Sequence, residues 1–559
     1  MGRVRRDRTR ERRSWGCLPQ ALALSVLSLF AAGLLVMHSR LGSLDGHGLS
    51  SSAELPTGRG RRRQIREITT ENATASFSGG PRGRAPGAQP GRIRCDDDPE
   101  HEAYGQVVYW DDPRSDRDRA MAASPPPFSE DSTENAGGGK RRRYLSFEPD
   151  CGGWNNIRME FETMIVLAAA TGRTLVVPPD SPLYLLTKDA KSKHRSLLAF
   201  LEKSALEDVV EMVTTREFFE AEILAEDGHY DLPADGTNRT RILNSIDRCD
   251  MRMKSDISCP LLQQYLADVA DHVPTWQAER NCLVMDDANW HRENPAGAAS
   301  NEQRRRVAHF CGPDRTPVYY DKEVHDAPLL HIKSRNKETR LLAHFYVFLY
   351  FPNPRLGNYY SRLVRDRVRY ADEVWCAGGK IVRSLRDESK GRGYMSLHVR
   401  RGDFQWKPMK IDSEQWLSSM RRSGFEPDSG QIVYVATDET DGTFFDPFRR
   451  HYELRFLSDF GEIAGLNGLD PNLVGMLDQV VASGGERFVG TYFSSFSAYV
   501  GRIRGYRGVP STKMYYGHPD RWNETHSWRY PKPSYSAREY PLGWAGIEGD
   551  DEPDEGDFF

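Results

Sequence analysis

The sequence lacks the local signatures of several common enzyme classes. It contains no G-x-S-x-G nucleophile elbow, no G-x-x-x-x-G-K-[ST] phosphate loop, no H-E-x-x-H helix and no C-x-x-C pair. The patterns typical of serine hydrolases, P-loop nucleotide hydrolases, zinc proteases and dithiol redox proteins are therefore missing. The acidic triplet Asp96-Asp97-Asp98 lies in a segment poor in apolar residues, and we interpret it as a solvated charge run rather than a metal site.

Apolar residues are also scarce for a chain of this length. They make up 38% of the 559 residues, whereas 28% are charged, a balance that indicates folded cores diluted by disordered segments. The length predicts two packed domains plus tails. The net charge of -4 hides an arginine-rich start and an acidic, glycine-rich end. Neither end resembles a folded basic surface, so we expect no nucleic-acid partner.

One long hydrophobic run stands near the start. No charged side chain occurs from Trp15 to Met37, which is about enough to cross a ~30 Å hydrocarbon core as a helix. Seven arginines precede the run and only Arg40 follows closely. The positive-inside rule then predicts a single-pass type II protein of the Golgi or endoplasmic reticulum membrane, with a luminal catalytic region. A cleaved signal peptide is the alternative, because Ala31-Ala32-Gly33 could be processed.

The eight cysteines fit a luminal location. Their spacing matches no zinc site, so we expect disulfides, with one luminal thiol left over and a short loop closed by Cys249 and Cys259. Sequons at Asn72, Asn238 and Asn523 agree with that location without proving it.

Composition divides the chain into six segments. We expect a cytoplasmic tail, a transmembrane signal-anchor, a disordered stem rich in Gly, Pro and Arg, two α/β halves and an acidic disordered tail. Their predicted ranges are 1–14, 15–38, 39–140, 141–385, 386–535 and 536–559.

Strand and helix patterns alternate in the first half. Tyr144 to Phe147 is a short strand candidate, and Ile157 to Thr171 is a helix that Gly172 ends. Thr174 to Val177 follows as a buried strand, which completes a βαβ unit with a Gly/Asn loop at the helix start. An isolated strand is also possible at Gln106 to Trp110, and the middle of the chain, to about Gly379, is predicted to be mainly helical.

The second half repeats the alternation. Its predicted strands each end in polar residues, and in doubly wound sheets ligands bind at the carboxyl ends of strands. We therefore predict an α/β fold of GT-B type, with two Rossmann-like halves and a cleft between them. The strands are Tyr394–Val399, Gln431–Ala436 and Arg487–Gly490, and the helices are Ser413–Arg422, Pro471–Ser483 and one that begins near Phe496.

Arg400 and Arg401, which follow the first of these strands, are the strongest chemical signal. An arginine at a strand end can clamp a diphosphate bidentately and stays charged at physiological pH. Neutralising a departing nucleoside diphosphate is the main electrostatic task in glycosyl transfer. The alternative is a surface arginine pair in an ordinary loop.

Other polar residues follow predicted strands or precede predicted helices. Thr437-Asp438 could accept hydrogen bonds from a ribose or a guanine edge, or cap the next helix. Ser494 and Ser495 could form an anion site at a helix start, or simply cap it.

In the first half, Gly153 permits a tight turn close to a ligand. Asn155, Asn156 and Arg158 would then face the cleft, unless they merely cap the helix and form a salt bridge.

Four segments in order resemble the GDP-fucose protein O-fucosyltransferase family and its broader fucosyltransferase relatives. They are Gly152-Gly153-Trp154-Asn155-Asn156-Ile157-Arg158, followed by a helix and Arg173-Thr174-Leu175-Val176-Val177-Pro178-Pro179, then His398-Val399-Arg400-Arg401-Gly402-Asp403, Val433-Tyr434-Val435-Ala436-Thr437-Asp438, and Asp478 through Phe488-Val489-Gly490 to Ser494-Ser495-Phe496-Ser497-Ala498. The resemblance implies a GT-B fold, an inverting mechanism and GDP-β-fucose as donor, with neither a metal nor another cofactor required.

The resemblance also assigns roles to residues. Arg400 would be catalytic, holding the β-phosphate and stabilising the leaving GDP. The GDP-sugar would bind mainly to the second half, and the first half would take the acceptor. The predicted substrate-binding residues are Gly153, Asn155, Asn156, Arg158, His398, Arg401, Thr437, Asp438, Asp478, Ser494, Ser495 and Phe496.

One position departs from the family pattern. Some members carry a glutamate base in the first glycine loop, where this sequence has Gly152. Asp403 or Glu160 could act as the base instead, or water could accept the proton.

The leading hypothesis is transfer of fucose to Ser/Thr of luminal proteins. The alternatives are a glycan (α1,6-type) fucosyltransferase and a catalytically degenerate luminal protein that only binds a GDP-sugar.

Overall fold

The computed structural model describes the two α/β halves and little of the predicted tails. The described residues are 93, 95, 141–150, 152–181, 183, 195–207, 209–249, 258–286, 292, 295–334, 340–402, 404, 406–507 and 509–527. All of them lie in the larger of the two units into which the chain divides. The predicted signal-anchor, the strand at Gln106 to Trp110 and the acidic tail lie outside them. Within the described part of the chain, no helix combines the length and the apolar character needed to cross a membrane.

The first half contains two parallel sheets. The larger has the strand order β3-β2-β1-β6, and the smaller has the order β5-β4-β7. The strands are β1 (Tyr144–Phe147), β2 (Thr174–Val177), β3 (Met212–Thr214), β4 (Asn281–Val284), β5 (Thr316–Tyr319), β6 (Leu329–Ile332) and β7 (Leu349–Tyr350). The helices are α4 (Trp154–Thr171), α5 (Lys203–Leu206), α6 (Thr215–Glu222), α7 (Gly236–Arg248), α8 (Ser258–Val269), α9 (Pro295–Ala298), α10 (Asn301–Cys311), α11 (Lys322–Asp326), α12 (Phe345–Phe348) and α13 (Pro354–Arg367).

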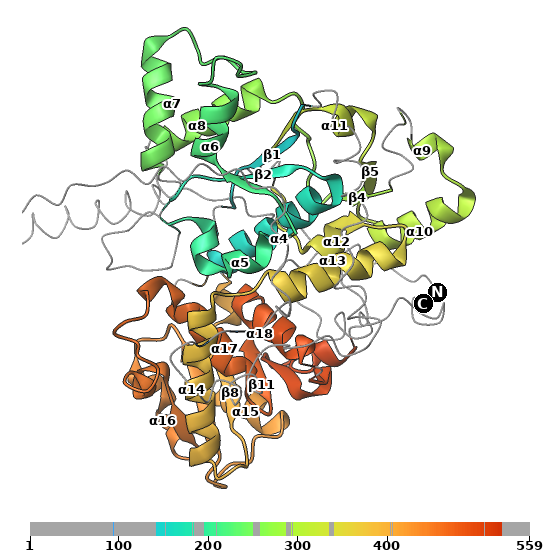
Figure 1. Cartoon of the computed structure of the whole chain (residues 1–559). Helices are drawn as coiled ribbons and strands as arrows, with labels where there is room; N and C mark the ends of the chain where they lie inside the picture. Colours follow the sequence, from blue (N-terminus) through green and yellow to red (C-terminus); the bar gives the residue numbers. More distant parts are fainter. Residues whose placement is uncertain are drawn as a thin grey trace, which may run out of the picture. The chain divides into compact units, whose positions relative to one another are not determined.

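The second half is built on one parallel sheet with the order β10-β9-β8-β11-β12. Its strands are β8 (Met395–Val399), β9 (Ile432–Thr437), β10 (Glu453–Arg455), β11 (Phe488–Thr491) and β12 (Met514–Gly517). Its α-helices are α14 (Asp372–Glu388), α15 (Ser413–Arg422), α16 (Asp446–Arg449), α17 (Val474–Ser483) and α18 (Ser495–Tyr506). Figure 1 shows these elements in orange and red.

Alternating side chains place this second sheet between two layers of helices. On β9, Ile432, Tyr434 and Ala436 belong to the core shared with α14, α17 and α18. Val433 and Val435 point to the other face, where α15 and α16 pack. Strands buried on both faces are typical of parallel sheets, which explains their continuous apolar sequence. The half is therefore a doubly wound α/β/α layer structure.

The predicted βαβ unit at residues 144–177 is confirmed. β1 and β2 pair in parallel, with Tyr144 opposite Thr174. Nearly every residue of α4 is buried, and the helix ends at Gly172, whose φ of 61° is the left-handed conformation that glycine adopts freely.

The middle region is mainly helical, as predicted, but it also contains short strands that the prediction did not include. Five strands, β3 to β7, lie between residues 212 and 350, and the edge strands β10 and β12 were also missed. These strands are two to four residues long, and β5 contains Pro317. Such short segments carry too few residues for a period-2 pattern, so their pairing with neighbouring strands decides their conformation.

Three disulfides lie within the described residues. They join Cys95 to Cys376, Cys249 to Cys259 and Cys282 to Cys311. The predicted short loop between Cys249 and Cys259 is therefore confirmed. Cys151 lies outside the described residues.

Candidate functional site

The strand order of the second half marks one place on its sheet. The chain begins at the central strand β8, adds β9 and β10 on one side, and then adds β11 and β12 on the other. In such sheets the order reverses between the first and fourth strands, and ligands bind there, outside the carboxyl ends. Here that place lies between β8 and β11, where Arg400 and Ser494 follow the two strands.

Arg400 leaves its guanidinium available at this place. Its backbone N–H donates to Thr491 Oγ1 at 2.9 Å, which ties the end of β8 to the end of β11. Its Nε lies 3.3 Å from Asp438 Oδ2, without hydrogen-bond geometry, and the side chain is 25% exposed. Within the described residues, no group accepts a hydrogen bond from this guanidinium. The Arg400 guanidinium is thus ion-paired with Asp438 and donates no hydrogen bond within the described residues.

Arg401, the next residue, is committed to the protein. Its Nε donates to Glu439 Oε2 at 2.7 Å and its Nη1 donates to the carbonyl of Ile411 at 2.5 Å. The guanidinium also stacks over Phe444, 4.3 Å from the ring centroid. Arg401 thus anchors the loop that follows β8, and its predicted contact with substrate remains a prediction.

Thr437 and Asp438 hold the same loop from β9. Thr437 Oγ1 donates to the carbonyl of Val399 at 2.7 Å. Asp438 Oδ1 accepts hydrogen bonds from the backbone N–H groups of Arg401 and Gly402, at 2.6 and 3.0 Å. Asp438 therefore caps the turn that presents Arg400, a role that neither the ribose nor the helix-cap interpretation had predicted.

The first turn of α18 lies beside Arg400. Ser494 occupies the N-cap position, but its side chain makes no capping hydrogen bond with the helix. Gly490 allows α18 to pack closely on β11, because a Cβ atom on Gly490 would lie 2.6 Å from Ser497 Oγ. The amides of Ser495 and Phe496 open the helix, where an anion is stabilised by N–H groups and the helix dipole.

His398 supports this helix start from within β8. The ring is buried, its Nδ1 lies 2.7 Å from Ser497 Oγ, and it stacks on Phe496 with the ring centroids 4.0 Å apart. Burial, and then the charge of Arg400, hold the pKa of His398 well below its usual value. The imidazole is therefore neutral at physiological pH and leaves the positive charge to Arg400.

Asp478, from α17, lies behind the same edge. It accepts a hydrogen bond of 2.5 Å from the hydroxyl of Tyr434. Burial raises the pKa of Asp478 to about 7, although the bond from Tyr434 opposes the shift.

The glycine loop of the first half meets the second half here. Gly153 precedes α4 as its N-cap residue. Asn155 Oδ1 accepts a hydrogen bond from Gln479 Nε2 at 3.1 Å, and the same nitrogen lies 3.1 Å from the carbonyl of Phe496. Asn156 packs on the loop itself, where a Cβ on Gly152 would collide with its side chain. Asn155 is thus brought next to the first turn of α18.

Arg158 lies deeper, between the halves. It is 1% exposed, pairs with Glu162, and stacks 3.5 Å above the ring of Tyr499. Glu162 also receives Arg502 Nη1 at 2.6 Å, and Glu162 and Arg502 are both fully buried. The salt-bridge interpretation of Arg158 therefore describes the geometry better than an orientation into an open cleft.

Of the two candidate bases, Glu160 and Asp403, the described residues include Glu160. Glu160 is fully buried, and its Oε2 accepts the backbone N–H of Asp150 at 2.5 Å. Burial, and then the neighbouring Asp150, hold the pKa of Glu160 well above its usual value. Asp150 in turn is bound by Arg340 Nε at 2.5 Å and Nη2 at 2.9 Å. Glu160 is therefore enclosed by the protein, and Asp403 lies outside the described residues.

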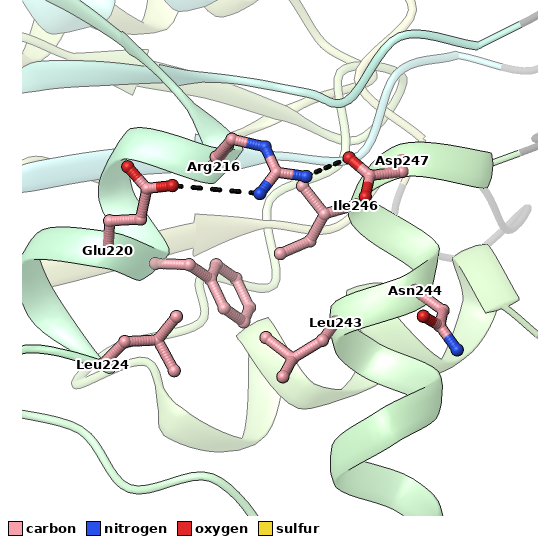
Figure 2. A pocket seen from close by; sticks show the side chains of 8 residues that line it. Arg216, Glu220, Leu224, Leu243, Asn244, Ile246 and Asp247 are labelled. Carbon is pink, nitrogen blue, oxygen red and sulfur yellow. Dashed lines mark hydrogen bonds and ion pairs between the residues drawn. The ribbon is translucent and has the colours of Figure 1, made fainter. Parts of the chain in front are cut away.

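A pocket of about 260 Å³ lies elsewhere, between α6 and α7. Figure 2 shows Arg216 bridging Glu220 and Asp247 at its rim, with Leu224 and Leu243 below. None of the predicted site residues lines it. Across the described residues, no group of three or more His, Cys, Asp or Glu side chains could hold a metal ion. A metal-independent reaction remains a prediction.

Sequence reasoning assigned no role to three residues that organise the site. Thr491 ties β8 to β11, Gln479 joins the two halves, and Ser497 meets His398. The polar Thr491 at a strand end and the lone glutamine in an apolar helix are local signals that could have been used.

Comparisons with known proteins identify a family for this chain. The sequence matches the profile of the family described as GDP-fucose protein O-fucosyltransferase over residues 144–507, more than half of the chain. A search of curated protein sequences finds no match.

Solved structures that resemble the chain include the following three. The apo-form of POFUT1 is 13% identical and the match covers 68% of this chain and 99% of that one, with a TM-score of 0.31. A mutant of Arabidopsis thaliana FUT1 in complex with GDP is 11% identical, and the match covers 75% of this chain and 77% of that one, with a TM-score of 0.31. The fucosyltransferase NodZ from Bradyrhizobium is 13% identical, and the match covers 66% of this chain and 94% of that one, with a TM-score of 0.31. At these identities and TM-scores the likeness adds nothing to the fold described above.

The profile match spans the glycine loop of the first half, Arg400 and the start of α18, and it shows that this chain belongs to the GDP-fucose protein O-fucosyltransferase family.

Proposed function

We propose that the protein transfers fucose from GDP-fucose to a Ser or Thr hydroxyl of luminal proteins, with inversion at the anomeric carbon. The observation that carries the proposal is the guanidinium of Arg400, which the described residues leave without a hydrogen-bond acceptor beside the first turn of α18. Two sources of positive potential thus converge at the point where the strand order reverses. Family membership favours GDP-fucose as the donor.

Arg400 acts on the leaving group in this mechanism. Its fork donates to the β-phosphate, and the amides at the start of α18 stabilise the same diphosphate. As the glycosidic bond breaks, negative charge grows on the β-phosphate oxygens, and these preorganised donors stabilise that charge more than the ground state. Asp438 contributes indirectly, because it fixes the turn that aims Arg400.

The acceptor proton has no base among the buried carboxylates of the first half. Glu160 is fully buried, with its pKa raised by burial, and Asp150 is engaged with Arg340. We propose that departure of GDP leads the reaction, and that water or Asp403 accepts the proton late. In such a reaction a strong general base contributes little to the rate.

The compartment and the membrane anchor belong to the proposal. The three disulfides support an oxidising lumen, because cytosolic thiols are kept reduced. We propose a type II protein of the Golgi or endoplasmic reticulum with residues 15–38 as its anchor. Protease protection of the folded region in intact vesicles tests this topology, and digestion from the outside would contradict it.

The decisive experiment measures GDP release from GDP-fucose by the detergent-solubilised full-length chain. Pooled luminal proteins serve as acceptors and GDP-mannose as the control donor. Arg400→Ala should lose at least ~100-fold in turnover, as removal of a transition-state donor does. Arg449→Ala is the matched control, because this arginine on α16 is exposed and contacts only its neighbours Gly442, Asp446 and Phe456, away from the strand ends at Arg400.

Two outcomes would overturn the proposal. If the wild-type chain binds GDP-fucose yet never releases GDP, the protein is a GDP-sugar-binding protein instead. If fucose appears on glycans rather than on Ser or Thr, as judged by mass analysis of the product, the acceptor assignment is wrong.

A further inference from the structure

A second group of aromatic side chains lies at the carboxyl ends of β8 and β11. Trp406, in the loop after β8, stacks on Phe493, in the loop after β11, with ring centroids 5.2 Å apart and planes inclined by 27°. Phe404 lies in the same loop, its ring centroid 6.0 Å from the Cζ atom of Arg400. All three side chains are partly exposed. They are therefore an aromatic surface beside a guanidinium that the protein leaves available.

Phe493 has a backbone conformation that its side chain disfavours. Its φ is 63°, in the left-handed region where glycine or asparagine is usual. Strain of this kind is retained when the surrounding structure requires it, and it is concentrated at functional sites. Phe493 packs on the buried cluster of Tyr492 and Tyr516, so the ring position is well defined. The sequence thus keeps a phenylalanine ring where glycine would be easier to fold.

A hydrogen bond joins the loop that carries Arg400 to the loop that carries Phe493. Thr491 Oγ1 accepts the backbone N–H of Arg400, and Phe493 follows Thr491 by two residues. A group attached to a phosphate on Arg400 would therefore lie near Phe404, and Trp406 and Phe493 stack on each other in the same pair of loops. The other side of Arg400 carries Asp438, Arg401 and Glu439, which are polar. The two sides differ in the part of a nucleotide sugar that they can accept.

We propose that Phe404, Trp406 and Phe493 bind the donor sugar and select a 6-deoxyhexose over its hydroxylated counterpart, an inference that rests on the proposed function. A 6-deoxyhexose presents a methyl group where other hexoses carry a hydroxymethyl group. Aromatic rings accept that methyl group, whereas an added hydroxyl loses water without gaining a partner. Selectivity for fucose then comes from these loops, and affinity for the nucleotide comes from the groups around Arg400.

The experiment compares GDP-L-fucose with GDP-L-galactose, which differs from it only by the hydroxyl at C6. Dissociation constants for both donors and for GDP alone are measured by calorimetry on the full-length chain, and turnover is measured in parallel. Phe493→Asn removes the ring and suits the positive φ, so it avoids new backbone strain. Trp406→Leu removes the other half of the stack and keeps an apolar residue.

The wild-type chain should bind GDP-L-fucose about 10- to 100-fold more tightly than GDP-L-galactose, the range that one added hydroxyl produces in an apolar pocket. Each variant should reduce that ratio by roughly tenfold while the affinity for GDP alone changes by less than about threefold. An unchanged ratio would overturn the inference. So would an equal loss of affinity for GDP alone, because the rings would then belong to the nucleotide site.

Failure of the proposed function is distinguishable from failure of this inference. If the donors are never consumed but the binding ratio responds to Phe493→Asn, the transferase assignment fails and the sugar pocket stands. If GDP-fucose is consumed but neither variant changes the ratio, the transferase assignment stands and the sugar pocket fails.

Discussion

The large sheets of the two halves share one topology but differ at the edge where ligands bind. The order β3-β2-β1-β6 in the first half corresponds to β10-β9-β8-β11 in the second. In the first half, Arg340 binds the carboxylate of Asp150 beyond the carboxyl end of β1, and the backbone N–H of Asp150 donates to the buried Glu160. In the second half, the end of β8 presents Arg400 with its guanidinium donors unused by the described residues. The strand order creates the place for a ligand, and the partners of each charge decide whether a ligand is needed there.

A second difference concerns rigidity. Arg158, Glu162 and Arg502 lie buried between α4 and α18 and join the halves. The glycine loop of the first half is held against α18 by Asn155 and Gln479. The first half therefore positions the edge at which the second half binds, and four experiments can break or sharpen that division.

The largest effect should follow removal of the charge between the halves. Glu162→Gln takes a carboxylate from between two buried guanidinium groups, so the free energy of unfolding should fall by about 3–5 kcal/mol. Chemical denaturation measures it. Glu220→Gln is the control, because that glutamate is 59% exposed and pairs only with the exposed Arg216. A loss below about 1 kcal/mol for Glu162→Gln would contradict the proposed junction.

Asp150→Asn should separate stability from nucleotide binding. The carboxylate is fully buried against Arg340, which is 21% exposed, so we expect a loss of about 2–3 kcal/mol in unfolding free energy. The affinity for GDP should stay within about twofold, because the first half only positions the site. Denaturation and calorimetry on the same preparation give both values. A tenfold loss of GDP affinity at unchanged stability would reverse the roles assigned to the two halves.

Arg400→Lys should reduce turnover without unfolding the second half. The ammonium keeps the charge but loses the bidentate fork, and turnover should fall by about tenfold or more. Arg449→Lys, the same change at an exposed site on α16, provides the control. Equal rates for Arg400→Lys and the wild-type chain would mean that charge alone suffices, and that the fork geometry has no part in the reaction.

The smallest effect concerns Asp478. Burial raises its folded pKa to about 7, so between about pH 4 and pH 7 the folded state holds a proton that the unfolded state has lost. This contribution to stability is present at low pH and disappears as the pH rises through about 7. The free energy of unfolding of the wild-type chain, relative to that of Asp478→Asn, should therefore be higher at about pH 6 than at about pH 8, by about 1 kcal/mol. A difference that is independent of pH would place the carboxyl in an ordinary solvated environment.

Local patterns predicted much of the fold. The βαβ unit at residues 144–177, the helix at Ser413–Arg422 and the strands that precede Arg400 and Asp438 follow from apolar runs, capping residues and glycine positions. These signals come from neighbours in the chain, and they are strong where an element is long. The short strands β3 to β7 lacked such signals, because their conformation depends on pairing with distant segments.

The sequence alone determined which residues stand at the strand ends, because an apolar strand must stop where polar side chains begin. Only the tertiary structure decided what those residues do. Arg400 and Arg401 are identical in type and adjacent in sequence, but Glu439 and Ile411 engage Arg401 while the described residues leave the guanidinium donors of Arg400 unused. In the same way Glu160 is enclosed because Asp150 and Arg340, which is 190 residues beyond Asp150, meet beside it. A side chain's availability depends on hydrogen-bond partners and burial, and both are set by contacts between segments that are far apart in the chain.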